Sequence, residues 1–462
     1  MKLVIFGTGN YYKQYKKYFS KDEILYLVDN DEQKQGTMLD GKIIYEKHQI
    51  NYSLCDYIII LIKQYKEIRQ QLLNMEIPLE KIKSYKDIID LTQQQIPIIS
   101  HSKELTLHQW ITEHKKNKII IFSHDFSRSG VPVALMNLAL LLKKMNYDVL
   151  LGALGNGKLQ EELEEHDVDY IADLELIYRD DKFLERMKEF NLAIIGSLVL
   201  AELGKTIVNV KIPIMWWLHE SNMDYYKKYR LPDEEDQIYY FAVSNRVKRV
   251  FNIFYPMKKI DELLYYLPSI NENTELKKIN KKILFAVIGK INKRKAQDIL
   301  IQAIELVPEN QREKMQVVFV GSDEEKSKLN WEKIQKRIPQ ISMIGELTQK
   351  EIEELYNKID ILVCPSRDDP MPIVVSQAMQ YGVPCIISDQ VGQSEFIKYR
   401  SGIMVFPNED INELLKLIIW CIENPQKLIE EGENALKIYE MYFTEQYMRR
   451  KLNGILKQIL EV

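Results

Sequence analysis

The sequence predicts an α/β protein made of three Rossmann-like units in tandem, followed by a C-terminal helix. Short apolar runs alternate with longer helical patterns along most of the 462 residues, a rhythm typical of βαβ units with parallel sheets. Glycine or polar residues directly follow many of the apolar runs, as they do in turns after parallel strands. The last residues, 441–462, carry no strand pattern and are predicted to form a helix.

The first predicted unit covers residues 1–95. Its apolar runs predict strands, and the stretches between them predict helices. At 92–103, three glutamines and a proline interrupt the pattern, so we expect the first linker there. The expected strands are 2–6, 24–28 and 57–61, and the expected helices are 10–19 and 63–75.

The second and third units cover residues 96–270 and 271–440, and a polar, loop-like stretch at 267–280 joins them. Their similar size favours two domains that face each other across a cleft. Open α/β sheets bind ligands at the carboxyl ends of their strands, so such a cleft suits a reaction with two substrates. The expected strands are 118–122, 147–153, 191–196, 212–218 and 239–244 in the second unit, and 281–289, 316–321, 360–365, 383–388 and 401–406 in the third.

Composition excludes several functional classes. The chain holds 63 Lys and Arg against 67 Asp and Glu, a net charge of -4, which argues against a general nucleic-acid binder but allows a local basic pocket. The four cysteines are far apart and form no CxxC pair, so buried reduced thiols are expected rather than disulfides or a zinc site. The start lacks a secretory pattern and no long apolar run follows, which predicts a cytoplasmic protein, with attachment to the inner membrane face left open.

A basic turn follows the first strand of the third unit. Between residues 281 and 300 there are six basic residues and one acidic residue. Lys290, Lys293, Arg294 and Lys295 stand after the strand and before a helix, where helix N–H groups already favour anions. A phosphate or diphosphate site and a solvated basic turn explain this pattern equally well.

Two further segments place polar groups after strands. Asp368 and Asp369 precede a helix that starts near Ile373, where an aspartate could face a ligand or simply cap the helix. His219 and Glu220 directly follow an apolar strand, a position that favours a site role more than a lone histidine does.

One more glycine opens a helix after a strand. Gly130 stands in the turn SRSGVP, where a backbone without a side chain could approach a ligand closely. A plain turn explains the same glycine.

Taken together, these segments resemble the retaining, nucleotide-sugar-dependent glycosyltransferases of family 4, which have the GT-B fold. The resemblance covers about residues 117–440. In that family a glycine and a basic pair follow the donor-side strand, and here they are Gly289 and Arg294–Lys295, with Ala296 where a glycine is expected. The resemblance implies that Arg294 and Lys295 hold the donor diphosphate, with Gly289 and Lys290 beside them.

The family signature, two glutamates eight residues apart, is matched in frame but altered in chemistry. Asp369 replaces the first glutamate, near the donor sugar, and is one methylene shorter. Gln377 replaces the second, which binds the ribose hydroxyls, and keeps hydrogen bonding without the charge. The resemblance also places Met371, Pro372 and Ile373 in the donor site. Ala378-Met379 and Gly382-Val383-Pro384 complete the match.

The acceptor-side half matches the family in three places. Gly130 lies in its glycine-containing turn, His219–Glu220 at its strand end, and Ser244 in the segment AVSNRV. The resemblance implies that His219 lies near the donor sugar and that Gly130, Glu220 and Ser244 contact substrate. It also implies that no metal is needed, and we do not expect the adjacent Asp368 and Asp369 to hold one.

The first 95 residues resemble a small Rossmann-like domain found at the front of some bacterial sugar-processing proteins. Their turn begins Gly7-Thr8-Gly9, but Tyr12 replaces the third glycine of a GxGxxG motif, and Asp29 stands where a ribose-binding acid would. A nucleotide site and a docking domain that has lost its ligand are both compatible with this segment.

The expected function is therefore transfer of a sugar, with retention, from a nucleotide diphosphate sugar to a glycan, lipid-linked or protein acceptor, in surface polysaccharide assembly. The donor is a substrate, and no cofactor is expected. Because of Asp369 and Gln377, a non-catalytic GT-B-like partner of another transferase is the main alternative. An NAD-dependent oxidoreductase built on residues 1–95 ranks last, since it leaves 117–440 unexplained.

Overall fold

The computed structural model describes residues 1–100, 103–233, 236–270, 279–323, 329–398 and 402–460. By the density of internal contacts, the chain divides into one unit of Met1–Arg128 with Asp148–Phe190, and another of Ser129–Tyr147 with Asn191–Val462. Most of the linker expected at 267–280 lies outside the described residues. The fold is mixed α/β with parallel sheets, as the sequence predicts.

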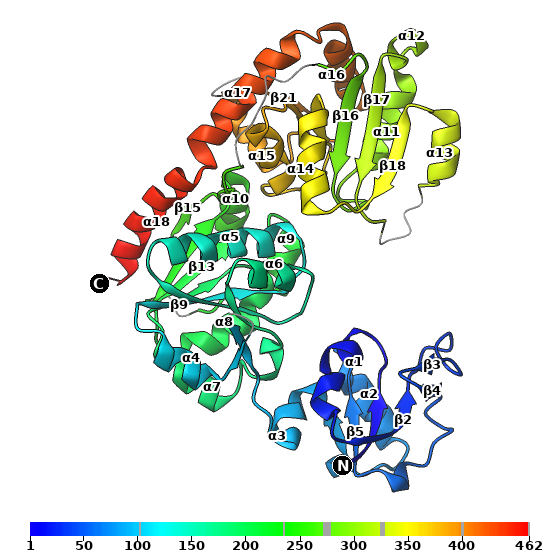
Figure 1. Ribbon diagram of the computed structural model, residues 1–462, viewed down its shortest axis with the longest axis vertical. Helices are drawn as coiled ribbons and strands as arrows, with labels where there is room; N and C mark the ends of the chain where they lie inside the picture. The colour runs from blue at the N-terminus through cyan, green and yellow to red at the C-terminus, as the bar shows by residue number, and fades with distance from the viewer. Residues whose placement is uncertain (101–102, 234–235, 271–278, 324–328, 399–401, 461–462) are drawn as a thin grey trace. The chain divides into compact units, whose positions relative to one another are not determined.

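The first unit begins with a mostly parallel sheet of order β3-β4-β2-β1-β5-β6, drawn in blue in Figure 1. Strands β1 and β5 are buried almost along their whole length, because helices cover the sheet and only apolar residues fit between. Its strands are β1 (Lys2–Phe6), β2 (Glu23–Val28), β3 (Met38–Leu39), β4 (Lys42–Tyr45), β5 (Tyr57–Ile60) and β6 (Ile82–Ser84), and its helices are α1 (Asn10–Tyr15), α2 (Tyr65–Leu73) and α3 (Ile88–Thr92).

The same unit holds a second set of strands in the order β8-β7-β11-β10-β9. The prediction of a plain linker at 92–103 was wrong in part, because Ile98 and Ile99 extend into β7 and pair antiparallel with β11. The elements are β7 (Ile98–Ser100), β8 (Lys103–Leu105), α4 (Leu107–Glu113), β9 (Lys118–Ser123), β10 (Asp148–Ala153), α6 (Leu159–Glu165), β11 (Asp169–Ile171), the short helix η5 (Leu174–Leu176) and α7 (Asp181–Met187).

Two acidic side chains at η5 bind the N-terminal segment. Asp173, 1% exposed, receives bonds from the hydroxyl of Tyr18 (2.8 Å) and the amide of Gln14 (2.7 Å), and Lys17 Nζ lies 2.5 Å from it. Glu175 accepts hydrogen bonds from the hydroxyls of Tyr11 (2.8 Å) and Tyr85 (2.9 Å). Hydroxyl and ammonium donors thus satisfy both acids, which a buried contact requires.

The second unit contains the parallel strands β12-β13-β14-β15, whose apolar runs are again buried. Gly204 lies against the ring of Trp216, where any side chain would collide. The elements are α5 (Gly130–Lys144), β12 (Leu192–Ile195), the short helix η6 (Leu198–Leu200), α8 (Ala201–Val208), β13 (Ile214–Leu218), α9 (Met223–Lys228), β14 (Ile238–Ala242), α10 (Asn245–Phe254) and β15 (Ile260–Glu262).

The second unit also contains a parallel sheet of order β18-β17-β16-β19-β20-β21, whose first strands lie side by side in green and yellow in Figure 1. Residues of β16, β17 and α11 form its apolar core. The elements are β16 (Ile283–Ile288), α11 (Gln297–Leu306), α12 (Glu309–Arg312), β17 (Met315–Val320), α13 (Trp331–Arg337), β18 (Ile341–Gly345), α14 (Gln349–Lys358), β19 (Ile361–Cys364), α15 (Ile373–Gln380), β20 (Cys385–Ser388), the short helix η7 (Gly392–Lys398) and β21 (Ile403–Phe406).

The C-terminal segment is helical, as predicted, and consists of α16 (Ile411–Glu423), α17 (Lys427–Tyr442) and α18 (Glu445–Leu460). Asp410 caps the first of these helices through the N–H of Glu413. Within the described ranges, none of the helices combines the length and apolarity that a bilayer crossing requires. All four cysteines are buried and free of disulfides, which confirms the prediction.

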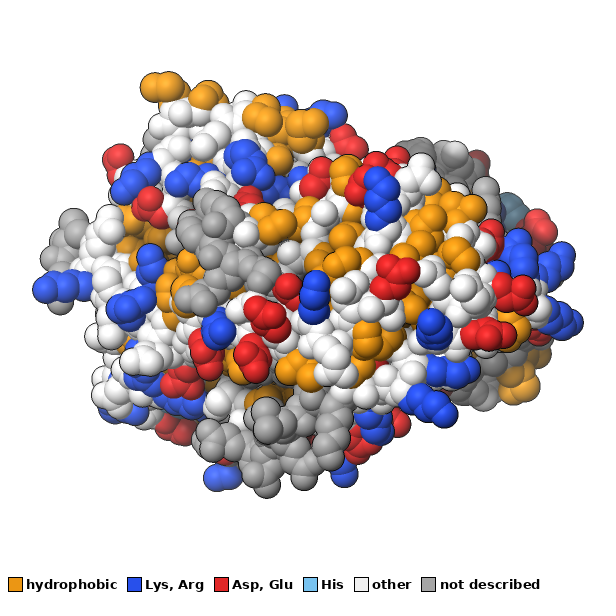
Figure 2. Space-filling model, turned by 90° about the horizontal axis from the view of Figure 1, so that it is seen from above, with side chains coloured by type: hydrophobic (Ala, Val, Ile, Leu, Met, Phe, Trp, Pro, Cys, Tyr) orange, Lys and Arg blue, Asp and Glu red, His pale blue; other side chains and the backbone are white. Residues whose placement is uncertain are grey.

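The charged side chains do not separate by sign on the face of the molecule that Figure 2 shows. Acidic and basic side chains are interspersed there.

Candidate active site

The basic turn that follows β16 depends on a glycine. Gly289 has a φ of 141°, a conformation that other residues rarely adopt, and its N–H donates to the carbonyl of Val320 (2.8 Å). Gly321, after β17, lies so close that an added Cβ would stand 2.1 Å from the Gly289 carbonyl oxygen. These two glycines let the chain turn at the carboxyl ends of the strands and place the basic loop 290–295 there.

Two cations of that loop contact one carboxylate. Lys295 Nζ lies 2.5 Å from Asp369 Oδ2, and Arg294 NH1 lies 3.4 Å from the same oxygen. Arg294 NH1 also donates to the Asp368 carbonyl (2.7 Å). The Asp369 side chain is only 9% exposed and that of Lys295 17%, whereas Arg294 is 48% exposed and can reach a ligand. The structure therefore brings together three of the four residues predicted to be catalytic.

Arg367 fixes the basic loop 290–295 through ion pairs and hydrogen bonds. It forms a two-pronged contact with Asp298 (2.8 and 3.1 Å), and its Nε donates to Glu409 (2.6 Å). Its backbone N–H donates to the Arg294 carbonyl (2.8 Å). The hydrogen bond with Asp298 is the main cause that raises the pKa of Arg367, so this side chain stays charged.

The loop that carries Asp369 is fixed by its backbone. The Asp369 N–H donates to the Gln390 carbonyl (3.1 Å), and the Gly392 N–H donates to the Asp369 carbonyl (3.0 Å). An added Cβ at Gly392 would stand 1.8 Å from the Pro370 carbonyl oxygen, so only glycine fits there. Helix α15 has Pro372 as its N-cap, so the capping role considered for Asp369 is wrong.

The start of α15 is held by a buried hydroxyl network. The Tyr265 hydroxyl donates to the Ser376 hydroxyl (2.8 Å) and contacts the Pro372 carbonyl (3.1 Å), and Gln393 Nε2 donates to the same two acceptors. Burial raises the pKa of Tyr265, which therefore stays protonated. Met371 is buried beside this network and Ile373 begins the helix, so the predicted segment 371–373 has a fixed backbone.

Gln377 lies one turn further along α15. Its side-chain oxygen accepts a hydrogen bond from the Tyr356 hydroxyl (3.3 Å), which also donates to the Val374 carbonyl (3.0 Å). Burial raises the pKa of Tyr356 well above its usual value, so this donor is permanent.

His219 follows the last residue of β13, and its ring lies 4.6 Å from that of Trp217, edge to face. Glu220 turns toward its own domain, where it accepts hydrogen bonds from the Ser197 hydroxyl (2.5 Å) and the Leu198 N–H (3.1 Å). These bonds satisfy the carboxylate and fix the strand end that carries His219.

Gly130 and Ser244 are both at helix starts. Gly130 is the first residue of α5, and an added Cβ there would meet no atom within 4 Å. Ser244 is fully buried and caps α10, since its hydroxyl accepts from the Val247 N–H (3.3 Å). In the basic loop, the Lys290 carbonyl accepts a hydrogen bond from the side chain of Gln297 (3.0 Å). This bond fixes the start of the loop to the start of α11.

Sequence reasoning missed the role of Asp368. Its Oδ1 accepts a hydrogen bond from the Ser221 hydroxyl (2.6 Å) and lies 3.1 and 3.0 Å from Nε and NH2 of Arg246. Ser221 stands two residues after His219, and Arg246 two residues after Ser244. Both partners therefore lie beside residues that the sequence predicts for the site. Their link to Asp368 could not be predicted from spacing alone.

The N-terminal turn is occupied by its own side chains. Asp29 Oδ2 accepts from the N–H (2.9 Å) and the hydroxyl (2.6 Å) of Thr8, and Lys34 Nζ lies 3.2 Å away. Burial acts to raise the pKa of Asp29, but the hydrogen bonds from Thr8 outweigh it and hold the pKa below its usual value. Tyr12 is buried, and its hydroxyl donates to Asp40 (2.9 Å).

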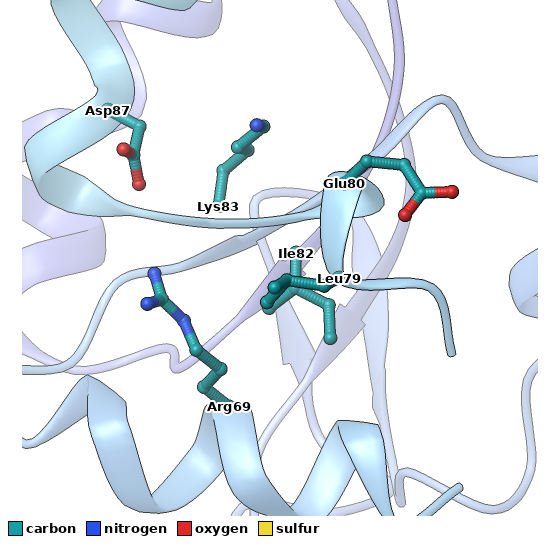
Figure 3. A pocket seen from close by; sticks show the side chains of 6 residues that line it. All are labelled: Arg69, Leu79, Glu80, Ile82, Lys83 and Asp87. Carbon is teal, nitrogen blue, oxygen red and sulfur yellow. The ribbon is translucent and has the colours of Figure 1, made fainter. Parts of the chain in front are cut away.

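An open hollow of about 410 Å³ also lies in the first unit (Figure 3). None of the residues predicted for the site contributes to its lining, which consists of Arg69, Leu79, Glu80, Ile82, Lys83 and Asp87. Within the described ranges, no group of three or more His, Cys, Asp or Glu side chains could hold a metal ion.

Three family models match segments of the chain. Residues 269–437 match "Glycosyl transferases group 1", residues 115–245 match "Glycosyl-transferase family 4", and residues 1–83 match "C2185-like, N-terminal". The first two matches cover the residues that the sequence predicts for the site, from Gly130 to Ser244 and from Gly289 to Gln377.

Curated relatives are distant. An uncharacterized glycosyltransferase of Methanocaldococcus jannaschii is 26% identical over 219 residues, which are 46% of this chain and 54% of the relative. An uncharacterized 41.2 kDa protein in the cps region of Klebsiella pneumoniae is 27% identical over 38% of this chain and 45% of its own length. The chain thus spans about half the length of these two relatives. An uncharacterized glycosyltransferase of Haemophilus influenzae is 21% identical over 71% of this chain and 97% of its own.

Solved structures show the same fold. The crystal structure of Anabaena Alr3699/HepE in complex with UDP-glucose has a TM-score of 0.61 at 16% identity, over 74% of this chain and 99% of that one. Sucrose-phosphate synthase from Thermosynechococcus elongatus has a TM-score of 0.59 at 15% identity, over 75% and 100%. These neighbours show the GT-B fold for this chain, and two of its segments match glycosyltransferase family models.

Proposed function

We propose that this protein is a retaining glycosyltransferase that moves a sugar from a nucleotide diphosphate sugar to a hydroxyl of its acceptor. The observation that carries the proposal is the cluster of Arg294, Lys295 and Asp369 at the carboxyl ends of β16 and β19. Strand ends of this kind are where α/β sheets bind ligands, and two cations there suit a diphosphate.

The proposed reaction proceeds on one face of the sugar. The bond between the anomeric carbon and the donor phosphate oxygen breaks, and its electron pair leaves with the nucleotide diphosphate. The acceptor oxygen forms a new bond to the same carbon from the same side, and its proton passes to the departing phosphate oxygen. Arg294 and Lys295 stabilise the negative charge that grows on this diphosphate, which is the largest electrostatic demand of the step.

Other residues bind the donor in this proposal. Gln377 hydrogen-bonds the ribose hydroxyls, and the fixed backbone of 371–373 with Gly289 and Lys290 lines the diphosphate. Asp369 balances the two cations and faces the sugar. His219, at the end of β13, lies on the acceptor side. Gly130, Ser244 and Glu220 act through the helix starts and the strand end that they fix.

We extend the proposal to the acceptor as a class. The proposed acceptor is a glycan or a lipid-linked glycan in cell-surface polysaccharide assembly, reached at the inner face of the membrane. The proteins that this chain resembles favour such an acceptor. One relative is encoded in a cps region, and one structural neighbour is described as a lipopolysaccharide outer core galactosyltransferase. Complexes of another neighbour with UDP and UDP-glucose make a UDP-sugar the first donor to test.

A donor screen tests the proposal. The purified chain is incubated with UDP-, GDP-, TDP- and CDP-sugars, and released nucleotide is measured with the double variant Arg294→Ala/Lys295→Ala as control. Release from one donor that the double variant loses would support the transferase. A retained anomeric configuration in the product, observed by NMR, would support retention.

One observation favours a second function, that of a non-catalytic glycan-binding partner. Gln377 provides no charge at the ribose position, and Tyr356 already engages its oxygen. A chain that releases no nucleotide from any donor, binds no nucleotide by calorimetry and still binds glycan would establish this alternative and contradict the transferase.

A further inference from the structure

We propose that Asp368 is a positioning residue that ties the strand end carrying His219 to the loop carrying Asp369. The proposal deepens the transferase function and rests on it for its kinetic consequence. Asp368 and Asp369 are neighbours in the sequence, yet their carboxylates have different partners. Asp369 contacts Lys295, whereas Asp368 contacts Ser221 and Arg246.

The contact is built from half-buried groups rather than from two mobile surface chains. The side chains of Asp368 and Arg246 are each 22% exposed, and Ser221 is buried. One carboxylate oxygen accepts from the hydroxyl at 2.6 Å and from both guanidinium nitrogens at 3.0–3.1 Å. A charge-assisted contact with several donors and restricted exposure is stronger and more directional than an exposed ion pair.

The partners of Asp368 come from fixed positions. Ser221 follows Glu220, whose carboxylate is bound by Ser197 and by a backbone N–H. Arg246 lies in the first turn of α10, two residues after the buried cap Ser244. Because Ser221 and Arg246 are held by their own elements, a movement of the loop that carries Asp368 would break its contacts with both.

The backbone of Asp368 connects this contact to the cations. Its carbonyl accepts from Arg294 NH1 (2.7 Å), and the next residue is Asp369. A shift of Asp368 therefore shifts both Arg294 and Asp369 relative to the segment 219–221. Misplacement by about 1 Å can cost about a hundredfold in rate, because reacting groups must be aligned as well as near. Asp368 itself touches no substrate in this scheme.

Helix α10 offers a matched control. Arg249 lies one turn after Arg246 and pairs with Glu395 (3.1 Å), but Arg249 is 64% exposed. Within the residues that the structure describes, the ion pair of Arg249 is with Glu395 and not with Asp368. If any ion pair along α10 sufficed, Arg249→Ala and Arg246→Ala would have equal effects.

The test is a double-mutant cycle on the full chain. Arg246→Ala, Asp368→Ala, their combination, Asp368→Asn and Arg249→Ala are compared for kcat, for the KM of the donor, and for nucleotide diphosphate binding by calorimetry. We expect kcat to fall about tenfold to a hundredfold in both single variants and no further in the double variant. Nucleotide affinity should change less than about threefold, and Arg249→Ala should keep its kcat.

A second readout needs no activity. Amide hydrogen exchange of residues 219–222 should become faster in Asp368→Ala and Arg246→Ala and stay unchanged in Arg249→Ala. Additive losses, an unchanged kcat in folded Asp368→Ala and Asp368→Asn, or unchanged exchange would overturn the proposal. A wild-type chain that transfers no sugar but shows the expected exchange would count against the transferase function alone.

Discussion

Lys295 and Asp369 are 74 positions apart in the sequence, and their charged groups lie 2.5 Å apart at the ends of two neighbouring strands. The carboxylate neutralises the ammonium group while no diphosphate is bound. In the proposed donor site, the diphosphate would share Lys295 with Asp369, and the acid would lie next to the sugar-bearing end of the diphosphate. This single pair links the two halves of the proposed donor site.

Lys295→Ala should lower kcat for sugar transfer by about a hundredfold to a thousandfold, because it removes a fixed cation from the charge that develops on the leaving group. Released nucleotide under saturating donor measures the effect. Lys293→Ala is the matched control, since its side chain is exposed in the same loop. Equal rates for the two variants would remove Lys295 from the proposed mechanism.

Ala296→Gly should stabilise the protein by roughly 0.5–1 kcal/mol, because Ala296 is held at a φ of 56°, where a Cβ is strained and glycine is not. Thermal unfolding by calorimetry provides the measurement. Ala303→Gly is the control, as it lies inside α11 and should destabilise by about 1 kcal/mol or more. Because Ala296 is buried, its methyl group also contributes packing, and a loss of stability as large as that of Ala303→Gly would show that Ala296 carries no strain.

Gln377→Glu should tighten binding of the nucleotide diphosphate by about tenfold, because a carboxylate makes stronger hydrogen bonds to ribose hydroxyls than an amide does. The Tyr356 hydroxyl would remain a donor to the new oxygen. Calorimetry with the nucleotide of the preferred donor measures the affinity. Gln302→Glu, on the exposed side of α11, adds the same charge elsewhere and should leave the affinity unchanged. Weaker binding by Gln377→Glu would place the ribose away from this residue.

His114→Gln should destabilise the protein more at about pH 5.5 than at about pH 8.5. Burial alone would lower the pKa of His114, but contacts with Asp169 (3.4 Å) and the Trp110 carbonyl (2.8 Å) outweigh it and raise the pKa above 6.5. A raised pKa stabilises the fold below the ordinary value, and that contribution is lost as the pH rises through the raised value. Urea unfolding at both pH values, followed by tryptophan fluorescence, measures the difference. An equal loss at both values would mean that His114 is neutral throughout.

The buried strands could be predicted from the sequence because both of their faces meet apolar groups. The runs at 2–6, 118–122 and 281–289 each contain the observed strand or match it to within a residue or two. Each run is a continuous stretch of apolar residues of strand length, without the spacing of an amphipathic helix. Such a stretch predicts a strand that is buried on both faces.

Strands near the sheet edges were harder to predict. Strand β18 has one buried residue, Ile341, followed by exposed and half-buried ones, and its serine and methionine give no continuous apolar run. Strand β7 follows a proline and has only three residues, so the glutamines before it dominated the prediction. Pairing with a neighbouring strand, which the local sequence does not contain, decides the structure of both segments.

The candidate site was predictable where a functional group follows its own strand. The basic loop after β16 and the acids after β19 needed only the rule that strand ends gather ligands. The contacts of Asp368 could not be predicted in this way, because Ser221 and Arg246 are 147 and 122 positions away in the sequence. Only the packing of the folded chain selects those partners among many serines and arginines.

The acidic contact at η5 sets a condition on exchanging parts between related proteins. Asp173 and Glu175 are satisfied by tyrosine hydroxyls, a glutamine amide and a lysine that all come from residues 1–95. A chimera that replaces this N-terminal portion must bring equivalent donors, or Glu175 loses both tyrosine hydroxyls and Asp173 is left with the amide of Asn156 (3.2 Å). Residues 1–95 can therefore be exchanged between related proteins only together with Asp173 and Glu175, the two acids that bind them.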